Sequence, residues 1–143
     1  MVEFALFFIM FMAVMFAIIS FSMAVYAYNS ISNAAREGTR YGMVHGANCW
    51  SNGTSCALSS SQIASYVASK TINTSALTVN VYCGPGGSTP PTGDCGQSTS
   101  GTPNDNPGNV VYVKVIYQFT AAPSLVPVGP ITMTTASQRV IWQ

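Results

Sequence analysis

The feature that most constrains this chain is an N-terminal stretch without a charged side chain, which runs from Phe4 to Ala35. A helix needs about 20 apolar residues to cross a bilayer, and this stretch is longer than that. Neither Pro nor Gly interrupts the chain before Gly38, so one helix is predicted from about Val2 to about Tyr41. Residues 4–28 are almost entirely apolar. They need an apolar environment on every side, either a membrane or a bundle of other helices.

The second half of the predicted helix has a different character. Polar side chains such as Asn29 and Arg36 alternate there with apolar ones such as Ile31 and Tyr41. This pattern is amphipathic, so we expect this half to pack on a folded head. The predicted organisation is therefore a membrane or filament-core helix over residues 1–45, followed by a head over residues 46–143.

Two simpler interpretations of the apolar stretch compete with this one. A cleaved signal peptide has an apolar region of about 7–15 residues after a basic start, which this chain does not show. A single-pass membrane anchor stays open as an alternative. Arg36 and Arg40 follow the span and favour a cytoplasmic head by the positive-inside rule. The cysteines favour the opposite side, and we give them more weight.

The segment after Ala47 is polar but nearly uncharged. Charged residues make up only 6% of the chain, against about 25% in typical soluble domains. The net charge of +1 provides no basic surface for nucleic acid. A surface rich in Ser, Thr and Asn suits an extracellular protein.

The four cysteines all lie in this polar segment and predict two disulfides in an oxidising compartment. Three pairings are open. We favour Cys49–Cys56 and Cys83–Cys95, because short loops close at low entropic cost. A zinc site is disfavoured, since no C-x₂-C pair is present.

The head reads as one short helix and three strands. The helix is predicted over Ser59–Thr71, with Ser60 or Ser61 as its cap. Period-two or β-rich patterns predict strands at Leu77–Tyr82, Val110–Phe119 and Ile131–Trp142. The predicted fold class is α+β: a long hydrophobic N-terminal helix plus a small head with a short helix and an antiparallel sheet of about three strands.

Glu3 is the one carboxylate beside the apolar stretch, and two interpretations stay open. It can lie among lipid headgroups, where the helix dipole favours it. It can instead pair with the N-terminal amine of a neighbouring copy and so fix the register of bundled helices, because buried charges must be paired. The apolar side chains expected to pack in such a bundle are Phe4, Leu6, Phe7, Phe8, Phe11, Phe16 and Phe21.

Two motifs give the chain a family resemblance. Val2-Glu3-Phe4-Ala5-Leu6 opens the helix, and Asn33-Ala34-Ala35-Arg36-Glu37-Gly38-Thr39-Arg40-Tyr41-Gly42 closes it. The pair resembles the TadE-like pseudopilins of tight-adherence pilus systems, with Thr39 in place of a usual Ala. The motif residues are Ala34, Ala35, Arg36, Glu37, Gly38, Arg40 and Tyr41. The C-terminal strand, Pro-containing turn and strand are similar too, whereas residues 45–109 are not.

The resemblance carries expectations about maturation and partners. It implies cleavage by a prepilin peptidase, insertion in the inner membrane, and extraction into a pilus by an assembly machinery. It also implies that Glu3 corresponds to the family's Glu, which usually stands at the fifth mature position. Members of the family are usually regarded as minor pilus components.

The sequence offers little for catalysis. His45 is its one histidine, with no sequence-near acid to orient it, and reads as an exposed junction residue. Asp94 and Asn104-Asp105-Asn106 carry oxygens that suit Ca²⁺, but they read better as solvated turn residues. We therefore predict no enzyme activity, no cofactor and no metal. Asn52 and Asn73 are candidate N-glycosylation acceptors.

Together these features predict a structural subunit of an extracellular type IV pilus-like filament. Its partners would be copies of itself, the inner membrane before assembly, and the prepilin peptidase and pilus machinery. The alternative is a minor TadE-like pseudopilin that primes assembly, or a single-pass membrane-anchored adhesin.

Overall fold

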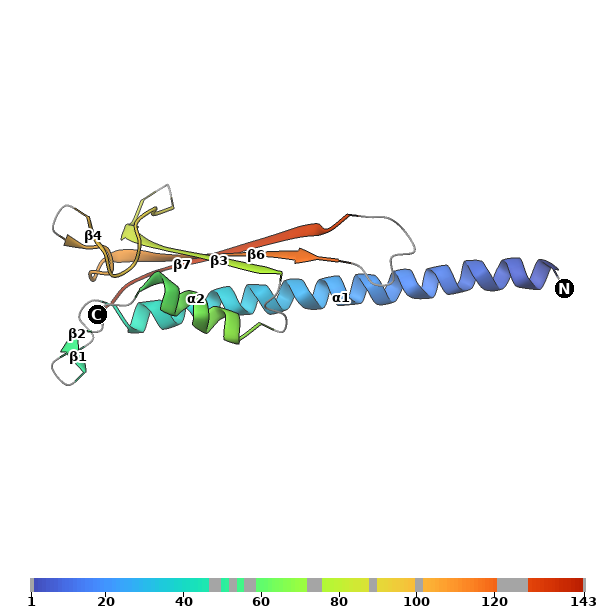
Figure 1. The fold of residues 1–143 in the computed structure, drawn as a ribbon, viewed down its shortest axis with the longest axis horizontal. Coiled ribbons are helices and arrows are strands. Elements are labelled where there is room, and N and C mark those ends of the chain that lie inside the picture. Colours follow the sequence, from blue (N-terminus) through green and yellow to red (C-terminus); the bar gives the residue numbers. More distant parts are fainter. Residues whose placement is uncertain are drawn as a thin grey trace.

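The computed structural model describes residues 2–46, 50–51, 54–55, 59–71, 76–87, 90–99, 102–120 and 129–142. Figure 1 shows one long helix that extends well beyond a small head made of a sheet and a second helix. The α+β class predicted from the sequence is confirmed.

The long helix α1 spans Val2–Val44 as one uninterrupted element, three residues beyond the predicted Tyr41. Its first half projects away from the head, and its second half packs against the sheet (Figure 1). The predicted division into residues 1–45 and 46–143 therefore separates two pieces that share a core, and it stays a prediction.

The main sheet has three antiparallel strands in the order β3-β6-β7. These are β3 (Leu77–Pro85), β6 (Asn109–Phe119) and β7 (Ile131–Val140), close to the predicted bounds. Two small hairpins join β1 (Trp50–Ser51) to β2 (Thr54–Ser55) and β4 (Ser98–Thr99) to β5 (Thr102–Pro103). In β6, burial alternates along Val111, Val113 and Val115, as expected for a sheet covered on one face.

The short helix α2 spans Ser60–Ser69, and its cap differs from the prediction. The N-cap is Ser59, whereas Ser60 and Ser61 already lie in the first turn. The Gln62 amide donates to Ser59 Oγ at 3.3 Å, and the Ser59 amide donates to Gln62 Oε1 at 3.3 Å. This reciprocal capping box selects Ser59, because only that serine has a Gln three residues later.

The head core forms where α1 and α2 cover one face of the sheet. Helix α1 packs on β6 and β7, while α2 packs on β3 and on α1. The core side chains are small or β-branched, which allows the two helices to lie close to the strands. They include Ile31, Ala34, Ala35, Ile63, Val67, Val81, Val111, Val113, Val115 and Ile141.

The disulfide Cys83–Cys95 confirms one of the two predicted pairings. It holds the loop after β3 against the head, and the Cys83 amide donates to Gly93 O at 2.8 Å. The predicted Cys49–Cys56 pair and the candidate glycosylation sites Asn52 and Asn73 lie outside the described residues.

Removing this disulfide should weaken the head. The double substitution C83S/C95S is expected to lower the free energy of unfolding by about 2–4 kcal/mol, because the unfolded loop is no longer constrained. Urea unfolding of the full chain in detergent measures this, with the same variant under reducing conditions as a reference. An unchanged midpoint would show that the helix packing alone holds the loop.

Two assignments of solvated residues were wrong. Asn104 and Asp105 retain only 5% and 2% of their exposure, because their turn packs against the disulfide loop. The Asn104 amide donates to Gln97 O at 2.9 Å, and Asn104 Nδ2 donates to Asp94 O at 3.0 Å. His45 is half-buried rather than exposed, since its ring stacks on Tyr41 at 4.1 Å.

Candidate functional site

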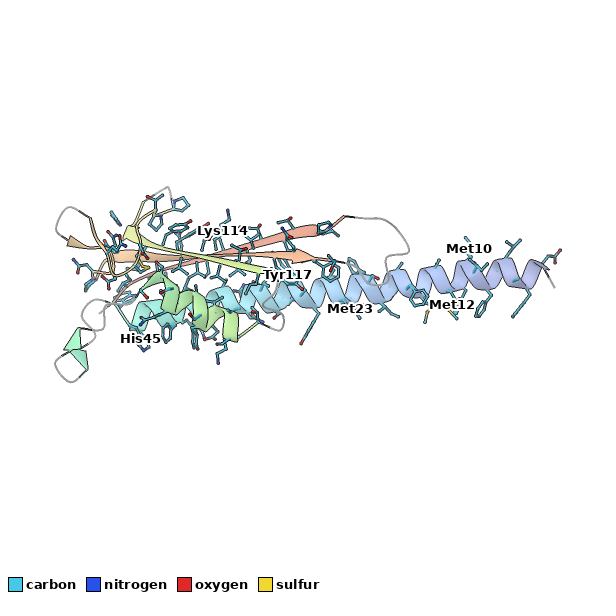
Figure 2. All side chains as sticks on the ribbon, viewed as in Figure 1. Met10, Met12, Met23, His45, Lys114 and Tyr117 are labelled. Atoms are coloured by element: carbon cyan, nitrogen blue, oxygen red, sulfur yellow. A yellow bond between two sulfur atoms is a disulfide. The ribbon has the colours of Figure 1, made fainter. Side chains whose placement is uncertain are left out.

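The candidate site is the half of α1 that projects from the head. Along Glu3–Ile19 every side chain is exposed, and Figure 2 shows side chains such as Met10 and Met12 with no head beneath them. The predicted packing residues are all exposed, six of them within this range and Phe21 just beyond it. They are Phe4, Leu6, Phe7, Phe8, Phe11, Phe16 and Phe21.

This surface is too apolar to remain in water. Burying one large apolar side chain contributes about 1.5–3 kcal/mol, and a whole domain is stable by only about 5–15 kcal/mol. Phe4 and Phe7 alone are 75% and 72% exposed. The helix is also long and apolar enough to cross a membrane. Because apolar side chains surround it on all sides, it suits a bilayer or a bundle rather than one edge of a head.

Glu3 lies in the first turn of α1, on the end farthest from the head. Its side chain is exposed and takes part in no ion pair among the described residues. The next acidic or basic side chain along α1 is Arg36. Within the described part of its own chain Glu3 has no charged partner, so a bundle that buries this end of the helix would need to supply one. The pairing with an N-terminal amine stays a prediction.

An apolar groove marks the junction of the projecting helix and the head. One wall is α1 and the other is the end of β6, and Figure 2 labels Met23 and Tyr117 from the two walls. Its lining residues are Met23, Tyr26, Ala27, Ser30, Ile31, Thr71, Tyr117 and Phe119. The apolar surface of α1 thus continues onto the base of the head.

The second predicted motif lies where α1 packs on the head, and its small residues are the closest contacts. Ala34 and Ala35 are buried at 2% and 0% exposure. A Cβ on Gly38 would overlap Val67 Cγ2 of α2, and one on Gly42 would lie 3.0 Å from Val111 Cγ1 of β6. These residues are small because two other elements approach the helix there.

The charged residues of the same motif face solvent. Arg36, Glu37 and Arg40 are exposed, and Arg40 Nη1 lies 3.5 Å from Glu37 Oε1. An exposed pair of this kind contributes at most about 1 kcal/mol. Tyr41 is half-buried and stacks on Tyr66 of α2, with ring centroids 4.4 Å apart. The motif therefore joins helix to head, and only its charged face is free for other molecules.

Thr39 makes a contact that the sequence did not reveal. Its side chain is fully buried, and its Oγ1 donates to Arg36 O at 2.9 Å. Because the Thr39 hydroxyl has a single hydrogen, which this bond uses, the Ser137 hydroxyl of β7 must donate to Thr39 Oγ1, 3.2 Å away. This bond links α1 to the edge strand. No pattern in the sequence connects residues so far apart.

Over the ranges that the structure covers, no three His, Cys, Asp or Glu side chains meet in a group that could hold a metal. The His45 side chain is engaged at the end of α1, where its Nδ1 lies within hydrogen-bond distance of Tyr41 O, at 3.0 Å.

Comparison with known proteins agrees with the position of this site. Residues 1–40 match the family model of TadE-like proteins, a range that contains the projecting half of α1 and most of the second motif. Searches of curated proteins and of solved structures each return no significant match. Over its N-terminal helix, the chain is therefore similar to TadE-like proteins.

Proposed function

We propose that this chain is a structural subunit of an extracellular type IV pilus-like filament. The observation that carries the proposal is the projecting half of α1, which is apolar on all sides and buries none of its surface in the head. Copies of the same helix can cover one another in a filament core, whereas the described part of the head leaves these side chains exposed. The TadE-like match supports a pilus-associated role, since it covers this helix.

The apolar projecting half of α1 would also hold the precursor in a membrane before assembly. A helix of this length and composition is stable in a bilayer, so the precursor would wait in the inner membrane with its head outside. The disulfide of the head favours that side, because disulfides persist in oxidising compartments. A prepilin peptidase would free the N-terminal amine, and the pilus machinery would then extract the helix. The chain would act as a building block rather than as an enzyme.

A second candidate role is a minor pseudopilin that primes assembly, or an anchored adhesin. The TadE-like match favours the priming role as much as the main-subunit role. Copy number separates them, since a main subunit is present at every level of the fibre.

Immunogold electron microscopy of whole cells tests the proposal, with antibody raised against the chain. A main subunit should be labelled along the whole fibre, and cells lacking the chain should carry no fibres. Label confined to fibre ends would assign the priming role. Label on the envelope of cells without fibres would assign the anchor.

A further inference from the structure

The turn at residues 104–108, which leads into β6, holds the most buried charged side chain among the described residues. Asp105 retains 2% of its exposure, and neither of its carboxylate oxygens has a hydrogen-bond partner there. Most buried polar groups in proteins are hydrogen-bonded, and buried charges are paired or coordinate metals. This carboxylate therefore lacks a partner that its environment requires.

The local backbone cannot supply that partner. An aspartate in a turn usually accepts from amides two or three residues later. Here Pro107 has no amide hydrogen, and the Gly108 amide donates to Ile141 O at 2.9 Å. The next amide, that of Asn109, donates to Asn106 O at 3.0 Å.

The neighbouring side-chain amides are engaged as well. Asn104 Nδ2 donates to Asp94 O at 3.0 Å, and Asn109 Nδ2 donates to Asn104 O at 3.0 Å. These donors are thus directed at carbonyl groups and not at the Asp105 carboxylate. The carboxylate lies in the same short segment as the side-chain amide oxygens of Asn104 and Asn106.

We propose that this turn binds a divalent cation of the Ca²⁺ type, with the Asp105 carboxylate as its charged ligand. Ca²⁺ takes six to eight oxygen ligands from carboxylates, amide and backbone carbonyls, and water. The side chains of Asn104 and Asn106 and the carbonyls of the turn offer oxygens of this kind. Softer metals prefer His and Cys ligands, and they are a poor match here, since Cys83 and Cys95 of the neighbouring loop are joined in the disulfide.

The cation would join two parts of the head. Asn104 is already bonded to Gln97 and Asp94 of the disulfide loop, and Gly108 is bonded to the segment after β7. Neutralising Asp105 would stabilise this junction. With one carboxylate, the site should be weak, with a Kd in the range of about 10⁻⁴–10⁻³ M found for extracellular calcium modules. This proposal is independent of filament assembly.

Thermal unfolding of the full chain in a non-ionic detergent tests the site, with CaCl₂, MgCl₂ or chelator as the only variables. Calcium at about ten times its Kd should raise the unfolding midpoint by roughly 3–8 °C above the chelator value. Magnesium should raise it less, because Mg²⁺ gives up its water reluctantly. Isothermal titration with CaCl₂ should give one site per chain. If 10 mM CaCl₂ does not raise the unfolding midpoint of the wild-type chain, the proposal is overturned.

Two matched substitutions test whether the calcium response arises at Asp105. Asp105→Asn keeps the shape of the side chain and removes its charge, so it should abolish the calcium response while leaving the chelated protein at least as stable as wild type. Asp94→Asn removes an exposed carboxylate that lines a separate cleft with Ser60 and Asn80, and it should keep the full response. A calcium response that survives Asp105→Asn, or that only Asp94→Asn removes, would overturn the assignment.

Discussion

Replacing Glu3 by alanine is expected to stop fibre growth and to leave folded, membrane-held monomer. In a helix bundle Glu3 would lie in a dry core, and its partner would be an N-terminal amine of a neighbouring copy. Removing the carboxylate leaves that amine buried and unpaired, which costs about 3–5 kcal/mol. Each subunit addition would then be weakened by more than about 100-fold. Fibre yield and membrane content, measured together by immunoblot of sheared and cell fractions, show the effect.

Glu37→Ala is the matched control for this prediction. It also removes an exposed carboxylate from α1, but one on the head side that pairs with Arg40 at 3.5 Å. We expect it to retain fibres at close to the wild-type level. Glu3→Ala cells with normal fibres would show that Glu3 is a headgroup residue, because in a lone anchor its removal is nearly neutral.

Gly38→Leu is expected to destabilise the head, although a helix interior prefers Leu over Gly by about 1 kcal/mol. The higher helix propensity of Leu would raise the free energy of unfolding, whereas steric overlap in the core would lower it. The sign of the measured change therefore shows which effect is larger. A Cβ on Gly38 already overlaps Val67 Cγ2, and Val67 is fully buried. Forcing a larger side chain into a packed core costs about 1–3 kcal/mol or more. We expect a net loss near the upper end of that range.

Urea unfolding of the detergent-solubilised chain, followed by intrinsic fluorescence, measures this loss. Arg36→Leu is the control, because its side chain is exposed on the same helix and its change should stay within about 0.5 kcal/mol. A Gly38→Leu protein as stable as wild type would mean that α1 and α2 are not in close contact at Gly38 and Val67.

The elements that could be predicted from the sequence are those with strong local signals. The uncharged run from Phe4 to Ala35 predicted the long helix. Alternating or β-rich runs predicted β3, β6 and β7 to within a few residues. The cap of α2 was missed although its signal was present. Three consecutive serines can each accept an amide bond, and only the position of Gln62 separates them.

The features that could not be predicted depend on contacts between distant segments. The burial of Asp105 needs the disulfide loop to fold onto its turn, and the bond from Ser137 to Thr39 needs β7 to lie against α1. Neither follows from spacing along the chain. Conversely, the apolar half of α1 was predicted from composition alone, because residues 4–28 are almost entirely apolar and need an apolar environment on every side.

Helical reconstruction from electron micrographs of purified fibres tests the central claim most directly. The account predicts that the projecting half of α1 forms the inner bundle, surrounded by the same helix from neighbouring copies, with the sheet of each head outside. It also predicts that Glu3 faces an N-terminal amine of an adjacent copy. Fibres whose core lacks this helix, or a native chain found only as single copies in the membrane, would contradict it.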